Sequence, residues 1–310
     1  IMAGVASSSQ NANNGIASGI APQATIIALN TSGVLTPSGW YYNGAQYRLD
    51  DLENVGCHSS CYAYTNLSPS IDLQLYDLPY HFFAAPIGNT SMINAAYSKC
   101  AISVGHFPNT SNIDFGPTSD NRIKPDLVAR SSAMNAPLYS SSSNSEYGLT
   151  GNDQSSFSVP QVAAGAVLLQ EIYGDYNSAA LPKSATLKAI MVHTAEDLNS
   201  VGPDTKSGYG LMDLEKAAKV IANDGTISKI IESSVGTSSS TYTYPVTASS
   251  YKPIEATLVW LDPRKMTGSS TILLINDLDI KITEGSNTYY PWSLNSSGAA
   301  INTVRNDRDR

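Results

Sequence analysis

The stretch that decides the fold reads NDQSSFSVPQVAAG, from Asn152 to Gly165. Ser155 and Ser156 are residues that cap helix starts, and Pro160 is tolerated only near a first turn. Apolar residues then recur at helical spacing as far as Gly174, where we expect the helix to end. The small residues at positions 163–166 suit a tight contact, so the helix is predicted to pack inside an α/β core.

A serine at the entrance of such a helix has two properties that a nucleophile needs. Its hydroxyl lies at the positive end of the helix dipole, and unpaired backbone amides lie beside it. The plainer interpretation is that Ser155 or Ser156 is a helix cap and nothing more. The helix pattern alone leaves both interpretations open.

The segment from Gln154 to Gly165 resembles the nucleophile motif of the subtilisin-like serine proteases, Gly-Thr-Ser-x-x-x-Pro-x-Val-Ala-Gly. Ser156 and Pro160 stand at the serine and proline of that motif, whereas Gln154 and Ser155 replace its Gly-Thr pair. Other segments resemble the family in the family's order: Gly4 with Gly19–Ala24, Gly88–Asn89, Gly116–Leu127 and Gly208–Asp213. Chance would rarely produce such ordered matches, and the chain is identified as a member of this family.

The resemblance implies a serine endopeptidase that cleaves polypeptides. Ser156 would attack the peptide carbonyl, and its backbone N–H together with the Asn89 amide would hold the oxyanion. On sequence alone Asn89 is equally a turn residue, because Gly-Asn pairs are common in loops. By position, Ser59, Ser60 and Cys61 resemble the strand edge that pairs with substrate, with Cys61 in place of glycine.

The resemblance also implies where the general base lies. The family's catalytic histidine stands in a His-Gly-Thr-x-x-x-Gly motif whose last glycine matches Gly4, so the histidine and the aspartate would precede Ile1. No histidine present has that context: the four are His58, His81, His106 and His193. We therefore expect residues 1–310 to be a fragment that is inactive by itself.

The amino-acid composition limits which classes of partner the protein can bind. The net charge is −8 and the pI is about 4.9, which argues against nucleic acid or an anionic membrane as a partner. Only 14% of residues are charged, a pattern common in secreted hydrolases, and no apolar stretch approaches the ~20 residues of a membrane span. We expect a secreted protein with no required cofactor. The cysteines, Cys57, Cys61 and Cys100, favour free thiols or one local disulfide over a metal site.

The chain divides near residue 225. Before it, continuous apolar runs at 25–29, 81–85 and 100–104 predict buried parallel strands, and 71–78 and 184–195 predict helices. This alternation predicts an α/β fold for residues 1–224, a parallel sheet with helices on both faces. The family resemblance implies that this region is a subtilisin-like peptidase domain without its N-terminal part. Asn89 and Ser156 would lie at the carboxyl ends of strands, where such sheets bind ligands.

After residue 225 the pattern changes to period two at 241–246 and 254–260. Residues 225–310 resemble the β-sandwich appended to some secreted subtilisin-like proteases, here incomplete, since a sandwich needs about 100 residues. Asp277 and Asp279 share one face at strand spacing, and relatives with this sandwich often hold calcium, so a structural calcium site is possible there. The alternative is an acidic strand end exposed to water.

Two other functions stay open. The departures from the family pattern at Cys61 and at Arg130–Ser131 allow a catalytically silent homologue that serves as a binding or structural protein. The aromatic clusters Trp40–Tyr42 and Tyr289–Trp292 allow a carbohydrate-binding protein, although such clusters are more often core or strand pairs.

Overall fold

The structure is a computed structural model of the chain. It describes residues 19–25, 34–36, 39–42, 45–47, 55–57, 67–137, 147–149, 153–236, 241–248, 253–265, 272–295 and 297–306.

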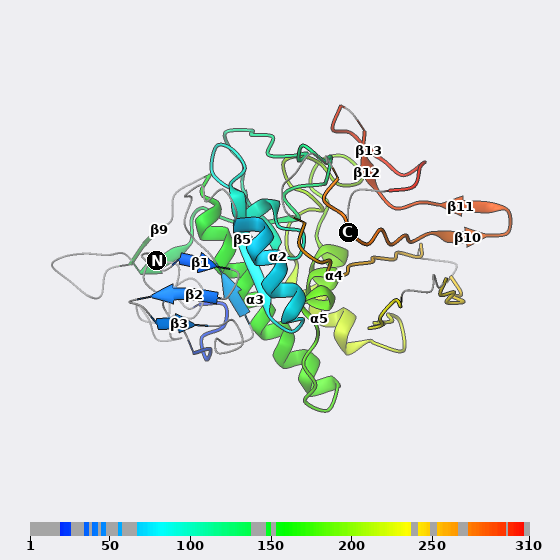
Figure 1. The fold of residues 1–310 in the computed structure, drawn as a ribbon, viewed down its shortest axis with the longest axis horizontal. Helices are drawn as coiled ribbons and strands as arrows, with labels where there is room; N and C mark the ends of the chain where they lie inside the picture. The colour runs from blue at the N-terminus through cyan, green and yellow to red at the C-terminus, as the bar shows by residue number, and fades with distance from the viewer. Residues whose placement is uncertain are drawn as a thin grey trace.

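A parallel sheet forms the centre of the described part (Figure 1). Four strands pair in chain order: β4 (Val55–Cys57), β5 (Phe82–Pro86), β6 (Ile102–Phe107) and β7 (Leu127–Arg130). Their registers place Gly56 beside Phe83, Ala84 beside Ile102 and Val104 beside Leu127. The apolar runs predicted near 81–85 and 100–104 are confirmed as β5 and β6; the run at 25–29 lies mostly outside the described residues.

Helices cover both faces of this sheet, as the alternation of elements predicts. The four are α2 (Leu67–Asp77), α3 (Ser155–Tyr176), α4 (Ser184–Thr194) and α5 (Leu214–Ala222). Phe82 and Ala84 of β5 pack with α3, α4 and α5, whereas Phe83 and Ala85 pack with α2. Successive residues of a strand point to opposite faces, so a strand buried on both faces reads as an unbroken apolar run.

The helix ends differ slightly from the prediction. Helix α3 passes Gly174 and ends at Tyr176, and the Asn177 N–H closes the last turn on the Gly174 carbonyl. A glycine inside a helix costs roughly 1 kcal/mol, which the buried apolar face of this helix outweighs. The predicted end at Gly174 is therefore wrong by two residues.

Smaller elements surround this layered core. An antiparallel sheet joins β1 (Val34–Thr36), β2 (Gly39–Tyr42) and β3 (Ala45–Tyr47), and β8 (Asn135–Pro137) pairs with β9 (Tyr147–Leu149). A short 3-10 helix, η2 (Asn94–Tyr97), follows β5 and precedes β6 along the chain. Within the residues described, no helix is both long and apolar enough to cross a membrane.

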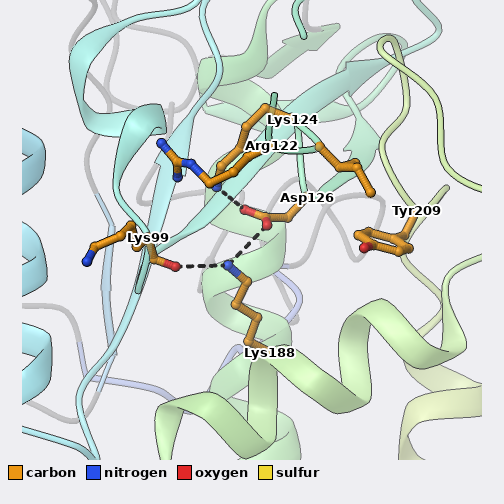
Figure 2. Close-up of a pocket in the computed structure, with 7 residues that line it drawn as sticks. Lys99, Arg122, Lys124, Asp126, Lys188 and Tyr209 are labelled. Carbon is orange, nitrogen blue, oxygen red and sulfur yellow. Dashed lines mark hydrogen bonds and ion pairs between the residues drawn. The ribbon is translucent and has the colours of Figure 1, made fainter. Parts of the chain in front are cut away.

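A cluster of buried charges lies just before β7, at the amino ends of the parallel strands (Figure 2). The carboxyl ends of the strands, which lead to Asn89 and α3, lie on the opposite side. Lys124 and Lys188 both bind the Asp126 carboxylate, with nitrogen–oxygen distances of 2.7 and 3.0 Å. Burial lowers the pKa of Lys124 to about 8, and the nearby Lys188 and Arg122 act in the same direction. Burial opposes ionisation of Asp126, but the two lysines hold the pKa of that carboxyl far below its usual range.

The C-terminal part has short antiparallel hairpins. β10 (Ile282–Glu284) pairs with β11 (Asn287–Tyr289), and β12 (Ser293–Leu294) pairs with β13 (Ala300–Ile301). Residues 241–246 and 254–260, where period two predicts strands, form no ladder among the described residues. The appended β-sandwich is therefore not confirmed, and the division near residue 225 stays a prediction.

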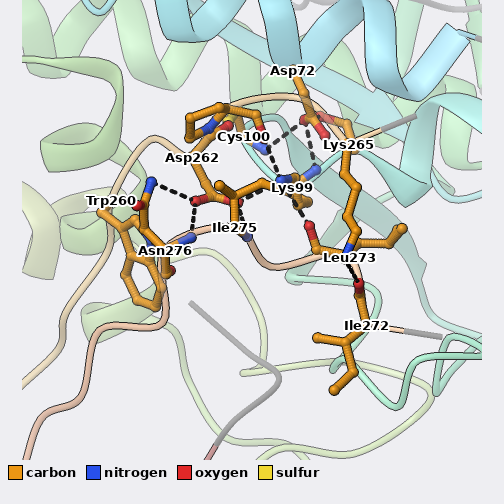
Figure 3. Close-up of polar contacts among 12 residues, drawn as sticks. Asp72, Lys99, Cys100, Trp260, Asp262, Lys265, Ile272, Leu273, Ile275 and Asn276 are labelled. Atoms are coloured by element: carbon orange, nitrogen blue, oxygen red, sulfur yellow. Dashed lines mark hydrogen bonds and ion pairs between the residues drawn. The ribbon is translucent and has the colours of Figure 1, made fainter. Parts of the chain in front are cut away.

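A buried ion pair joins this C-terminal part to the α/β core (Figure 3). Lys99 Nζ lies 2.5 Å from Asp262 Oδ2, and both side chains are almost fully buried. The same ammonium donates to the carbonyls of Pro263 and Leu273, at 2.6 and 3.0 Å. Asp262 also accepts the backbone N–H groups of Ile275 and Asn276. One carboxylate thus fixes a turn of the C-terminal part and binds that turn to the core.

Candidate active site

Ser155 and Ser156 begin helix α3. Gln154 is the cap residue, and its side chain makes no capping hydrogen bond. Ser155 is fully buried, whereas Ser156 is half-buried. Neither serine is the cap that the plainer interpretation expects, and Ser156 has the accessibility that a nucleophile needs.

Asn89 reaches the same helix end from the turn after β5. The Ser155 N–H donates to Asn89 Oδ1 at 3.0 Å, and the Ser155 hydroxyl donates to the same oxygen at 3.2 Å. Because these bonds use the amide oxygen, the amide nitrogen keeps its two N–H donors, which meet no acceptor among the described residues. The two residues expected at the site, Asn89 and Ser156, are therefore brought together at the start of α3.

Ser155 is a site residue that sequence reasoning missed. Besides binding Asn89, its hydroxyl accepts the Gly88 N–H at 3.2 Å. Gly88 has a φ of +118°, and a Cβ there would lie 2.0 Å from the Ser91 carbonyl oxygen, so the turn requires glycine. The available signal was that Ser155 keeps a hydroxyl where the family motif has threonine.

The first turns of α3 are also bonded to the end of β7. The Ser158 hydroxyl donates to the Ala129 carbonyl at 2.7 Å. The Gln161 side-chain amide donates to the Arg130 carbonyl and to the Phe157 carbonyl. These buried hydrogen bonds fix the helix start relative to the sheet edge at which Asn89 emerges.

Asp153 holds the turn before α3 in place. Its carboxylate accepts the backbone N–H groups of Thr110 and Ser111, at 2.7 and 3.1 Å, as well as both hydroxyls. Burial works against ionisation, yet these hydrogen bonds keep the pKa of Asp153 below its usual range. The Asp153 backbone has a φ of +52°, a left-handed conformation that its side-chain bonds stabilise.

Behind this turn lies His106 of β6, which is 1% exposed. Its Nε2 is 3.5 Å from Asp153 Oδ1, and its ring packs edge-on against Phe115. Burial lowers the pKa of His106, against the opposing effects of Asp153 and Asn109. At neutral pH we therefore treat it as a neutral packing residue under the turn.

The other described histidines have structural surroundings as well. His193, on α4, places Nδ1 3.0 Å from the Thr257 hydroxyl. His81 is buried directly before β5, at the strand end opposite the one that leads to Asn89. This agrees with the absence of a His-Gly-Thr context at these positions, and His58 lies outside the described residues.

Two sets of predicted residues remain without a test. Ser59, Ser60 and Cys61 lie outside the described residues, immediately after β4. Asp277 and Asp279 lie outside the described strands, and both carboxylates face the Arg305 guanidinium at 2.7 Å. The described part holds no cluster of three or more carboxylate, imidazole or thiol ligands. Calcium binding at this face stays a prediction and would have to displace Arg305.

Comparison with known proteins decides the family. The sequence model of the Subtilase family (Peptidase_S8) matches residues 1–210 of the chain. The chain belongs to the subtilase family. This confirms the resemblance carried by the serine motif and agrees with the parallel sheet and its covering helices.

Curated relatives of this subtilase come from Dictyostelium discoideum. The chain is 30% identical to the "Serine protease/ABC transporter B family protein tagA", over 54% of the chain and 11% of that protein. It is 24% identical to tagD of the same description, over 70% of the chain and 15% of that protein. The chain thus spans only about a tenth to a seventh of these relatives.

Among solved structures, one similar to this subtilase is described as "Crystal Structure of a Lanthipeptide Protease". The two chains are 17% identical, with a TM-score of 0.44, over 56% of this chain and 63% of that one.

Proposed function

We propose that this subtilase is a serine endopeptidase that cleaves polypeptides through an acyl-enzyme on Ser156. The observation that carries the proposal is the anchored Asn89 amide. Its oxygen is held by Ser155 at the start of α3, which leaves its N–H donors for a developing oxyanion beside the neighbouring Ser156.

The proposed reaction has two halves. Ser156 Oγ forms a bond to the scissile carbonyl carbon as its proton passes to a histidine; the carbonyl oxygen becomes an anion held by the Ser156 N–H and Asn89 Nδ2. The peptide C–N bond then breaks, and the amine leaves with that proton. Water hydrolyses the ester and restores the serine. We propose that this histidine and its aspartate come from residues before Ile1, as the resemblance to the family motif implies.

The substrate is proposed to bind as an added strand beside residues 59–61. Position in the family motif supports this, together with β4, which directly precedes these residues at one end of the described four-stranded order. The low charged fraction, 14%, supports a secreted location as the place of action. No cofactor is part of the proposed chemistry.

Cleavage of an unfolded protein tests the proposal. The chain is extended upstream of Ile1 to include the Asp-Thr/Ser-Gly and His-Gly-Thr segments, and peptide release is followed by mass spectrometry. We expect cleavage that is lost in Ser156→Ala and kept in Ser233→Ala, a control at an exposed serine. A folded extended chain that cleaves nothing would instead favour the catalytically silent homologue.

A further inference from the structure

The cavity in the charge cluster, at the amino ends of the strands, is lined by more cations than carboxylates. Four buried cations line a cavity of about 20 Å³ together with Asp126: Lys99, Arg122, Lys124 and Lys188. Lys99 is paired with Asp262, and Arg122 with Asp120. Lys124 and Lys188 share Asp126 alone, so this triad has two positive charges and one negative.

Asp126 cannot balance both lysines by further bonding, because its oxygens are already used. Oδ2 accepts the Lys124 ammonium at 2.7 Å and also the Ser103 N–H and hydroxyl at 2.6 and 2.7 Å. Oδ1 lies 3.0 Å from Lys188 Nζ. A further buried carboxylate, Asp72, accepts the Ser98 hydroxyl and the Lys99 and Cys100 N–H groups rather than a lysine. Among the described residues, Asp126 is therefore the carboxylate that meets both ammonium groups directly, in a site where charge is expensive to bury.

Side-chain N–H groups that have no acceptor indicate the same lack of negative charge. The three donors of Lys188 are taken by Asp126 and the carbonyls of Lys99 and Ala101. Lys124 binds only Asp126 and the Ser98 carbonyl, which leaves one N–H. Arg122 donates one N–H to Asp120 and one to the Tyr97 carbonyl, which leaves three of its five without a partner in the described part of the chain.

The directions in which the lysine and arginine side chains point agree with this count of N–H donors (Figure 2). Lys124, Asp126 and Lys188 point toward one another, and the Arg122 guanidinium lies beside Lys124. The Lys99 ammonium points away, toward its partner Asp262. The positive charge that faces the cavity thus comes from Arg122 and the lysine pair.

We propose that this cavity is a binding site for one small inorganic anion of the size of chloride. The volume has room for a single ion of about the size of a water molecule. A bound anion supplies the missing negative charge and accepts the spare donors of Lys124 and Arg122. Water would accept the donors but leave the charge.

Thermal unfolding of the 310-residue chain in chloride, with gluconate as the oversized replacement at constant ionic strength, tests the site. We expect Tm to rise with chloride and to saturate, as binding to the folded state requires. Lys124→Met should remove the rise. Lys219→Met, which deletes an exposed lysine paired with Glu215 on α5, should keep it. A rise that is equal in both variants, or no rise in the unchanged chain, would overturn the proposal.

A second measurement does not depend on the variant folding. Anomalous scattering from a crystal grown in bromide should show one bromide between Arg122 and Lys124. At pH 8, addition of chloride should also draw protons from the solution, because an anion beside Lys124 favours its charged form. An empty cavity together with no proton uptake would mean that Lys124 is neutral or that water fills the site, and the proposal would fail.

Discussion

At the scale of single residues, the site depends on which atom of Asn89 is left unbound. Ser155 holds Oδ1 with its backbone N–H and its hydroxyl, and the amide nitrogen meets no acceptor among the described residues. Ser156 is the half-buried neighbour that can meet a substrate. The proposed nucleophile and the proposed oxyanion donor are thus both next to one buried serine, Ser155.

Substitutions at Asn89 and Ser155 separate these two roles. In the extended chain, Asn89→Ala should lower kcat by about 10²–10³ with little change in KM, because the donor acts on the transition state. Ser155→Ala should cause a smaller loss, since its backbone N–H still holds Asn89, and Ser155→Thr should restore activity. Steady-state kinetics on a peptide substrate measure both effects. An unchanged kcat in Asn89→Ala would exclude the proposed oxyanion donor.

Lys124 gives a pH-dependent prediction. Its pKa is about 8 in the folded protein and about 10.5 when unfolded, so between these values the unfolded chain holds a proton that the folded chain has released. Stability should therefore rise from pH 8 toward pH 10, on the order of 2–3 kcal/mol at most. Urea unfolding in gluconate buffer measures this rise, and Lys124→Met should flatten it. The same slope in both proteins would mean that Lys124 is not buried as a cation.

At the scale of elements, helix α3 connects the site to the core. Its Val159, Val162 and Ala166 pack on β5, β6 and β7, while its first turns bind the carbonyls at the end of β7. On the other side, Gly165 lies against Leu214 of α5. The small residues at 163–166 therefore serve the close packing that the sequence predicts.

Two glycines of α3 offer a matched pair. A Cβ at Gly165 would lie 2.7 Å from Leu214 Cδ2, whereas at Gly174 the nearest atom is 3.7 Å away. Gly165→Val should cost about 1–3 kcal/mol by overpacking, while Gly174→Ala should stabilise by up to about 1 kcal/mol. Equilibrium urea unfolding distinguishes them. Equal effects of the two substitutions would contradict the close α3–α5 contact.

The sequence predicts local features of this fold better than contacts between distant segments. Unbroken apolar runs identify β5 and β6, because a strand covered on both faces has no polar side. Alternation at 241–246 and 254–260 misleads, since a period-two pattern forms a strand only where a partner strand is available. The Lys124–Asp126–Lys188 cluster could not be predicted, because Lys188 comes from a distant segment and meets Lys124 and Asp126 only in the folded chain.

At the scale of the whole molecule, the C-terminal part is bonded to the peptidase core at several places. The buried Lys99–Asp262 pair is one, the Asn121 side chain donates to the Leu294 carbonyl at 2.8 Å, and His193 meets Thr257. In Figure 1 the C-terminal strands lie on the side of the core away from β1–β3. These contacts give the two parts one shared stability.

Lys99→Met tests that coupling. It leaves the Asp262 carboxylate buried without its cation, and we expect a loss of about 3–5 kcal/mol in the free energy of unfolding. Limited proteolysis should then cut faster within residues 253–306, whereas Lys219→Met should behave as the unchanged chain. If Lys99→Met kept full stability and protection, the ion pair would have no role in docking.

The central claim is that Ser156 is the nucleophile of this subtilase, and covalent labelling tests it most directly. The extended chain is treated with a serine-directed fluorophosphonate, digested, and the labelled residue is read by peptide mass spectrometry. The account predicts a label on Ser156 that is absent in Ser156→Ala and strongly slowed in Asn89→Ala. Labelling of Ser156→Ala at full yield, or a label on Ser155, would contradict it.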